Sequence, residues 1–85
     1  MAAIGYVTGY NKGVDISKSD TVNIAGPKPL TDAVYVGGAG IVVAVWQDDS
    51  TSNLTAAVGE ILPISIKRVN SATTSATLMV ALYAV

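Results

Sequence analysis

The chain contains no cysteine and no histidine among its 85 residues, which excludes several kinds of chemistry at once. Without cysteine there is no disulfide and no thiolate zinc site, and without histidine there is no Ser-His catalytic triad. Charged side chains are also few, at 13% of the residues, and the formal net charge is −1. A protein that binds nucleic acid needs a basic surface for the phosphates, so the sequence predicts no nucleic-acid partner.

The chain is instead rich in aliphatic residues. Hydrophobic residues make up 51% of it, and because phenylalanine is absent, the aromatic residues are Trp46 and four tyrosines. The longest uncharged stretches, residues 33–47 and 70–85, are shorter than the roughly 20 residues of a membrane-spanning helix, so we expect no membrane segment. A chain of this length forms one small domain. Because it is so apolar, we expect it to bury further surface against neighbouring subunits.

Apolar and polar residues alternate along most of the chain, which predicts strands rather than helices. The predicted strands are residues 21–25, 33–36, 41–46, 54–58, 61–69 and 76–85. The strand at 41–46 is β-branched and apolar on both faces, so it is either central in a packed sheet or covered by a partner. The sequence therefore predicts an all-β fold, a small antiparallel β-sandwich or barrel of about six to seven strands.

Glycine, proline and short polar side chains mark the predicted turns. The Gly37-Gly38-Ala39-Gly40 cluster predicts a tight turn, after which the chain runs back along the preceding strand. Gly59-Glu60 is expected to form a two-residue hairpin loop with a positive φ at the glycine. Residues 47–53 form a polar loop, and Pro63 indicates an edge strand or a bulge. The polar loop lacks the ligand spacing of a calcium-binding EF-hand loop, so we predict no metal site.

The first twenty residues differ from the rest of the chain. Glycine recurs there every four residues, at Gly5, Gly9 and Gly13. Glycine at this density disfavours regular structure, because it loses much conformational freedom on ordering. We therefore predict an extended N-terminal arm over residues 1–20 and a β-domain over residues 21–85.

Six residues are candidates for contacts between subunits: Tyr6, Tyr10, Trp46, Arg68, Met79 and Tyr83. Trp46 and Tyr83 are predicted to anchor either the core or an interface, because large aromatic side chains are scarce in this chain. Arg68 follows the inward-facing residues of its strand, so it either caps the end of the core or pairs with an acidic residue across a subunit boundary. The adjacent Lys67 is predicted to be solvated. No carboxylate pair in a cleft is expected, so we predict no enzyme activity and no cofactor.

Several short strings resemble a known family of small virion proteins. They are Ser19-Asp20, Ala33-Val34-Tyr35-Val36-Gly37-Gly38-Ala39-Gly40, Val58-Gly59-Glu60-Ile61-Leu62-Pro63-Ile64-Ser65-Ile66-Lys67-Arg68-Val69, Ala76-Thr77 and Ala81-Leu82-Tyr83. Together they resemble the spike base protein family, known from the head spikes of gene transfer agents and from tailed-phage genomes. The resemblance covers about residues 19–83, and its most specific part is the string from Val58 to Pro63.

The resemblance implies a virion structural protein on the exterior of a tailed-phage or phage-like capsid, assembled in the host cytoplasm. It implies a head spike base or a decoration (cement) protein that forms a homo-oligomer, a trimer or a pentamer. The expected partners are the major capsid protein and a spike fibre protein, and no catalytic residues are carried over. Two alternatives stay open. One is a neck or tail component, and the other is a carbohydrate-binding module of a virion with Tyr6, Tyr10 or Trp46 exposed to solvent.

Overall fold

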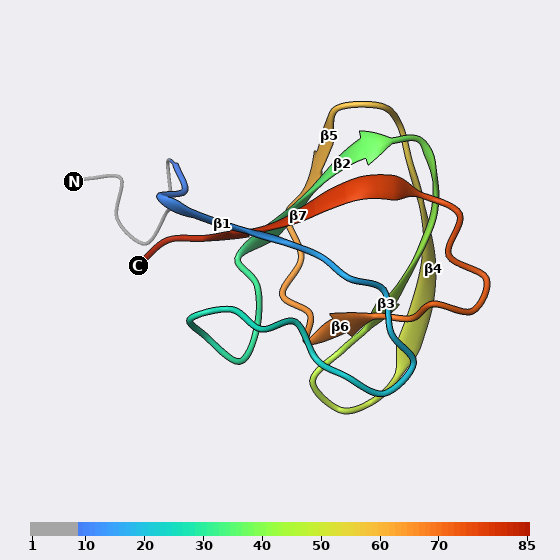
Figure 1. Ribbon diagram of the computed structural model, residues 1–85, viewed down its shortest axis with the longest axis horizontal. Helices are drawn as coiled ribbons and strands as arrows, with labels where there is room; N and C mark the ends of the chain where they lie inside the picture. Colours follow the sequence, from blue (N-terminus) through green and yellow to red (C-terminus); the bar gives the residue numbers. More distant parts are fainter. Residues whose placement is uncertain (1–8) are drawn as a thin grey trace.

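A computed structural model of the chain describes residues 9–85 as seven β-strands in two antiparallel sheets (Figure 1). The strands are β1 (Lys12–Asp15), β2 (Ala33–Gly38), β3 (Gly40–Val45), β4 (Thr51–Ala56), β5 (Glu60–Leu62), β6 (Arg68–Val69) and β7 (Thr77–Tyr83). One sheet has the order β1-β7-β2-β5 and the other the order β4-β3-β6. The predicted all-β fold is confirmed. Within residues 9–85 we find no helix long and apolar enough to cross a membrane.

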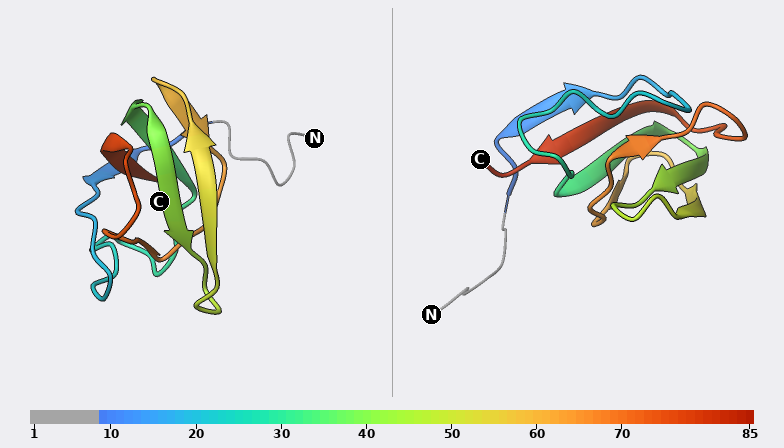
Figure 2. Two further views of the ribbon diagram at one scale, coloured as in Figure 1. Left: turned by 90° about the vertical axis from the view of Figure 1, so that its right-hand side faces the viewer. Right: turned by 90° about the horizontal axis from the view of Figure 1, so that it is seen from below.

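The core lies between the two sheets, which form two layers (Figure 2). Val34 and Val36 of β2 face Val42 and Ala44 of β3 within one cluster of buried side chains. The predicted alternation of β2 is confirmed, because both valines are fully buried while Tyr35 between them is exposed. All four residues 42–45 of β3 are buried within the single chain. The chain itself therefore covers the strand that is apolar on both faces.

The glycine-rich cluster does not form the predicted hairpin turn. Ala39 alone separates β2 from β3, and these strands belong to different sheets, so the chain passes from one layer to the other at this point. Gly40 comes close to the segment that precedes β7: a Cβ atom there would lie 2.7 Å from the backbone nitrogen of Ala76. Glycine is therefore required here for a close backbone approach rather than for a two-residue turn.

The hairpin predicted at Gly59-Glu60 is also wrong, because the strands on its two sides do not pair with each other. The β4 and β5 strands lie in different sheets, and β4 ends at Ala56, two residues earlier than the predicted strand. Gly59 does have the predicted positive φ, of 76°. The Glu60 backbone nitrogen donates to the Ala57 carbonyl at 3.2 Å, which makes Gly59 the third residue of a turn, the position where a type II turn requires positive φ. The β3–β4 hairpin instead turns at the polar residues 47–50.

The long strand predicted at residues 61–69 is two short strands in different sheets. The edge strand β5 ends just before Pro63, consistent with the edge that proline indicated. Thr31 holds the intervening segment, because its hydroxyl donates to the Ile64 carbonyl at 2.8 Å and accepts from the Ile66 backbone nitrogen at 3.1 Å. This buried threonine replaces the ladder partner that the segment would have in a continuous strand.

The N-terminal part of the chain also differs from the prediction. Residues 12–15 form β1, which pairs with β7 along its whole length, so the predicted arm is wrong for this segment. Gly13 suits that pairing because a Cβ there would lie 3.3 Å from Val80. Residues 21–25, predicted as a strand, belong to neither sheet. The Ser19 hydroxyl accepts from the backbone nitrogens of Thr21 and Val22 and turns the chain, and the Ile24 backbone nitrogen donates to the Lys67 carbonyl at 2.9 Å. Tyr6 lies outside the described residues.

Candidate interaction surfaces

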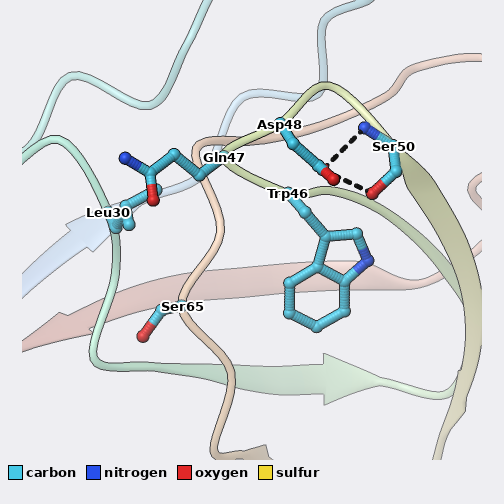
Figure 3. A pocket seen from close by; sticks show the side chains of 6 residues that line it. All are labelled: Leu30, Trp46, Gln47, Asp48, Ser50 and Ser65. Atoms are coloured by element: carbon cyan, nitrogen blue, oxygen red, sulfur yellow. Dashed lines mark hydrogen bonds between the residues drawn. The ribbon is translucent and has the colours of Figure 1, made fainter.

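Trp46 directly follows β3 at the start of the hairpin turn, where its ring is half-buried against the core. The indole nitrogen donates to the Ser52 hydroxyl at 2.9 Å. The ring borders an open hollow of about 680 Å³ that is also lined by Leu30, Gln47 and Ser65 (Figure 3). The indole nitrogen is thus already hydrogen-bonded within the hairpin. Trp46 therefore connects this turn to the core. Tyr10, the other described candidate for an aromatic platform, is 37% exposed and precedes β1 rather than bordering this hollow.

Asp48 faces the same hollow but is occupied by the turn itself. Its carboxylate accepts from the Ser50 hydroxyl at 2.6 Å and from the Ser50 backbone nitrogen at 3.1 Å (Figure 3). These bonds from Ser50 hold the pKa of Asp48 below its usual value, since they favour the ionised carboxylate. The aspartate thus closes an Asx-type turn, which is the common role of aspartate in such loops.

Lys67 and Arg68 both bind partners within the chain. Lys67 forms an ion pair with Asp49 of the hairpin turn, and only 18% of its side chain is exposed, so the predicted solvation is wrong. This lysine lowers the pKa of Asp49. The Arg68 guanidinium donates through Nη1 to the Asn23 amide oxygen at 3.0 Å, and its Nε is buried without a hydrogen-bond partner in residues 9–85. Arg68 therefore joins β6 to the segment at residues 21–25.

Met79 and Tyr83 are core residues of the single chain, with 4% and 1% exposure. This burial agrees with the core alternative predicted for Tyr83 and corrects the assignment of Met79 to an interface. The Tyr83 ring packs so closely on Gly26 that a Cβ there would lie 2.0 Å from the tyrosine oxygen. Burial raises the pKa of Tyr83, and the negative charge of Asp32 raises it further.

Most acidic side chains of the protein are bound within the chain. Five of the six accept hydrogen bonds or form ion pairs: Asp20, Asp32, Asp48, Asp49 and Glu60. The sixth, Asp15 at the end of β1, has no such partner among residues 9–85. Lys18, three residues further, is likewise exposed and outside the two ion pairs.

An apolar surface lies on the outer face of the four-stranded sheet. We call Tyr35, Ile61, Leu78 and Val80 the outer-face patch. Tyr35 sits opposite Ile61 of β5 and opposite Val80 of β7, so three of these side chains form one row across the sheet. Leu78 is 77% exposed and Ile61 is 50% exposed. In the sequence, Leu78 and Val80 are two residues apart and so share one face of the strand, but only the strand order places Tyr35 and Ile61 beside them.

Leu78 has an unusual backbone conformation for a strand residue, with φ of 54°. The two other non-glycine residues with positive φ among residues 9–85, Asp49 and Thr73, lie outside the strands. Gly37 on β2 makes room for this distortion, because a Cβ at that position would lie 2.9 Å from the Leu78 Cβ. The left-handed conformation strains any residue with a side chain, so Leu78 is held outward at a cost to the isolated chain.

Comparison with known proteins gives one informative match. No family model and no curated protein matches the chain. Among solved structures, the chain is similar to one described as "Capsid of native GTA particle computed with C5 symmetry", where GTA denotes a gene transfer agent. The TM-score is 0.78 with 28% sequence identity, over 94% of this chain and 94% of that chain. This likeness supports a capsid-associated structural protein.

Proposed function

We propose that this chain is a structural protein on the outside of a phage-like particle, acting as a head spike base or a decoration protein. One observation carries the proposal: the likeness to a chain of a gene-transfer-agent capsid structure extends over 94% of both chains. The string from Val58 to Val69, which carries the resemblance to spike base proteins, forms most of the type II turn, β5, the segment after β5, and β6. It therefore carries the chain from the four-stranded sheet to the three-stranded sheet.

The proposed role is non-catalytic. Supporting this, the sequence has no cysteine or histidine, and five of its six acidic side chains are held by local hydrogen bonds or ion pairs. A carboxylate that serves as a general acid or base needs access to substrate. The proposed partners are further copies of this chain, the major capsid protein and a spike fibre protein, and the proposed location is the capsid surface after assembly in the host cytoplasm.

Cryo-electron microscopy of particles made with and without this chain tests the proposal. We expect particles without the chain to keep closed heads and attached tails and to lose density from the outer head surface. Restoring the chain from a plasmid, with a small tag, is expected to return that density with added mass at the same sites. Fractionation of the chain with tails, or unchanged head density in its absence, would reject the proposal and favour a neck or tail component.

A further inference from the structure

Among residues 9–85, β4 is the least protected of the strands that lie at the edge of a sheet. An open strand edge pairs readily with other chains, so proteins usually guard it with charged side chains, with proline or by keeping the strand short. The edge strand β1 carries Lys12 and Asp15. The β5 strand has three residues and ends before Pro63, and β6 has only two residues. By contrast, β4 has six residues, pairs with β3 in unbroken register, and contains no charged residue and no proline.

The outer side of β4 presents backbone groups that no part of the described chain binds. On β3, Val43 and Val45 direct their carbonyls away from β4, where each accepts a hydrogen bond at 3.0 Å from the segment that contains β6. The residues opposite them on β4 are Asn53 and Thr51. Opposed residues of an antiparallel pair exchange either both hydrogen bonds or none, so the N–H and C=O groups of Asn53 and Thr51 point outward. Among residues 9–85, no loop or further strand bonds to these groups, and both side chains are exposed. We call this row the open edge of β4.

Residues 1–8 have a composition that fits the open edge of β4. They contain no charged side chain and no proline, and Ile4, Tyr6, Val7 and Thr8 are of residue types enriched in strands. Eight extended residues span about 26 Å, and the six residues of β4 span about 20 Å, so the segment is long enough to cover the whole edge. Gly5 lowers its strand propensity, so the pairing has to come from an edge that is already formed.

The position of the segment favours the edge of a neighbouring copy over the edge of its own chain. The Asn11 side chain is bonded to the backbone of Val85, and this end of the chain lies across the molecule from β4 (Figures 1 and 2). A segment of eight residues that first crosses the molecule has too few residues left to run along β4. On an adjacent copy the same segment can lie along the edge over its full length.

We propose that residues 1–8 of each copy add a strand to the open edge of β4 in the next copy. The backbone groups of the segment then satisfy those of Thr51 and Asn53, which is the mode of recognition known as strand addition. Each copy gives one segment and receives one, so the contact joins copies head to tail and closes a ring, as a trimer or a pentamer requires. The inference rests on the homo-oligomer of the proposed function and names the contact that builds it.

A proline on the open edge tests the receiving side of the contact. Asn53→Pro removes an outward N–H and leaves the hydrogen bonds between β3 and β4 in place, because this N–H does not point toward β3. Asn53→Ala is the matched control, since it keeps the N–H and removes only the side chain. In native mass spectrometry of the full chain, the wild type and Asn53→Ala are expected to form the same oligomer, whereas Asn53→Pro associates at least about tenfold more weakly. Circular dichroism checks that each variant is folded.

Prolines in the segment test the giving side of the contact. Tyr6→Pro/Val7→Pro changes two neighbouring residues, so at least one proline falls on the side of the segment that faces β4. This double variant is expected to lose the oligomer while keeping the fold of residues 9–85. Tyr6→Thr/Val7→Thr is its control, because threonine keeps both N–H groups and a high strand propensity, and it is expected to assemble.

Mixing the two proline variants gives the sharpest result. The Asn53→Pro chain keeps its segment, and the Tyr6→Pro/Val7→Pro chain keeps its open edge, so together they can form one contact and no more. Well above the concentration at which the wild type assembles, the mixture is expected to give a 1:1 heterodimer and no ring. A monomeric wild type, a segment variant that assembles as the wild type does, or a mixture without heterodimer would overturn the proposal. A loss of assembly in Asn53→Pro alone would overturn it too and assign the edge to another occupant. These outcomes leave the particle-based test of the proposed function unaffected.

Discussion

Gly26 packs directly against the ring of Tyr83, and at the scale of single residues this contact gives a sharp prediction. Gly26→Ala places a methyl group where the tyrosine ring lies, and the ring is 1% exposed and cannot swing into solvent. We expect the free energy of unfolding to fall by about 1–3 kcal/mol, measured by urea denaturation. Gly9→Ala is the control, because nothing lies within 4 Å of the added Cβ, and its stability should match the wild type. Equal stability of the two variants would contradict this packing.

Leu78 gives a prediction of the opposite sign. Leu78→Asn relieves the strain of positive φ while removing little buried surface from the monomer, since the side chain is 77% exposed. The free energy of unfolding, measured at a dilution where the protein is monomeric, is expected to rise by up to about 1 kcal/mol. Val22→Asn should change it by less than about 0.5 kcal/mol. A loss of stability in Leu78→Asn would show that the leucine makes contacts that this conformation does not reveal.

Residue-level predictions from sequence succeeded where a property is local. The positive φ of Gly59 follows from its place in a turn, and it was predicted although the wrong strands were assigned to the pair. The Arg68 contact could not be predicted in detail, because its partner Asn23 lies 45 residues away in the chain. Sequence alternation placed Arg68 on the inward side of its strand but carried no information about which loop would reach it.

At the scale of elements, Asp32 holds the C-terminal residues that follow β7 against the segment that leads into β2. The Asp32 carboxylate accepts from the Ala84 backbone nitrogen at 2.8 Å and pairs with Lys28 at 2.6 Å. The hydrogen bond from Lys28, followed by that from Ala84, lowers the pKa of Asp32 below its ordinary value of 3.8. The carboxylate therefore contributes stability that is present above this value and is lost as the pH falls through the pKa of the folded protein.

This linkage predicts a pH dependence of the free energy of unfolding that the substitution Asp32→Asn reduces. Between about pH 5 and about pH 2, Asp32→Asn should lose less stability than the wild type, because the amide does not titrate. Urea midpoints across this range provide the measurement. Part of the wild-type slope should persist, since the pKa values of Asp48 and Asp49 are lowered too. Asp15→Asn is the control and should follow the wild type; an Asp32→Asn variant that also follows it would refute the assignment.

Strand faces were easier to predict than strand partners. The inward face of β2 follows from the two-residue period, which is independent of the neighbour that a strand finds, whereas the period of β7 separates its two faces without saying which one is buried. Both glycine turns were assigned to hairpins, because adjacent strands pair most often with each other. Here the chain changes sheet at Ala39 and again between Ala56 and Glu60. Glycine suits a sheet-to-sheet crossing as well as a tight turn, so composition alone did not separate the two.

At the scale of the whole molecule, the chain covers its own core. The sequence suggested that apolar strands would need neighbouring subunits, yet residues 42–45 are buried without any. We therefore predict that the protein stays folded when it is diluted until any oligomer dissociates. Trp46 emission should remain blue-shifted at nanomolar concentration, and the unfolding midpoint should become independent of concentration. Unfolding on dilution would instead indicate an obligate oligomer.

The pairing of β1 with β7 brings residues 11 and 85 together, where the Asn11 side-chain oxygen accepts from the Val85 backbone nitrogen at 2.8 Å. Because these strands are antiparallel neighbours, a pull that separates residues 11 and 85 loads their hydrogen bonds one after another, starting at Asn11, instead of shearing the whole ladder together. Breaking the hydrogen bonds between β1 and β7 one at a time needs far less force than breaking them all at once. A force applied between residues 11 and 85 would thus separate β1 from β7 before the rest of the fold opens. A force applied to the outer face of the sheet would leave the two sheets packed together.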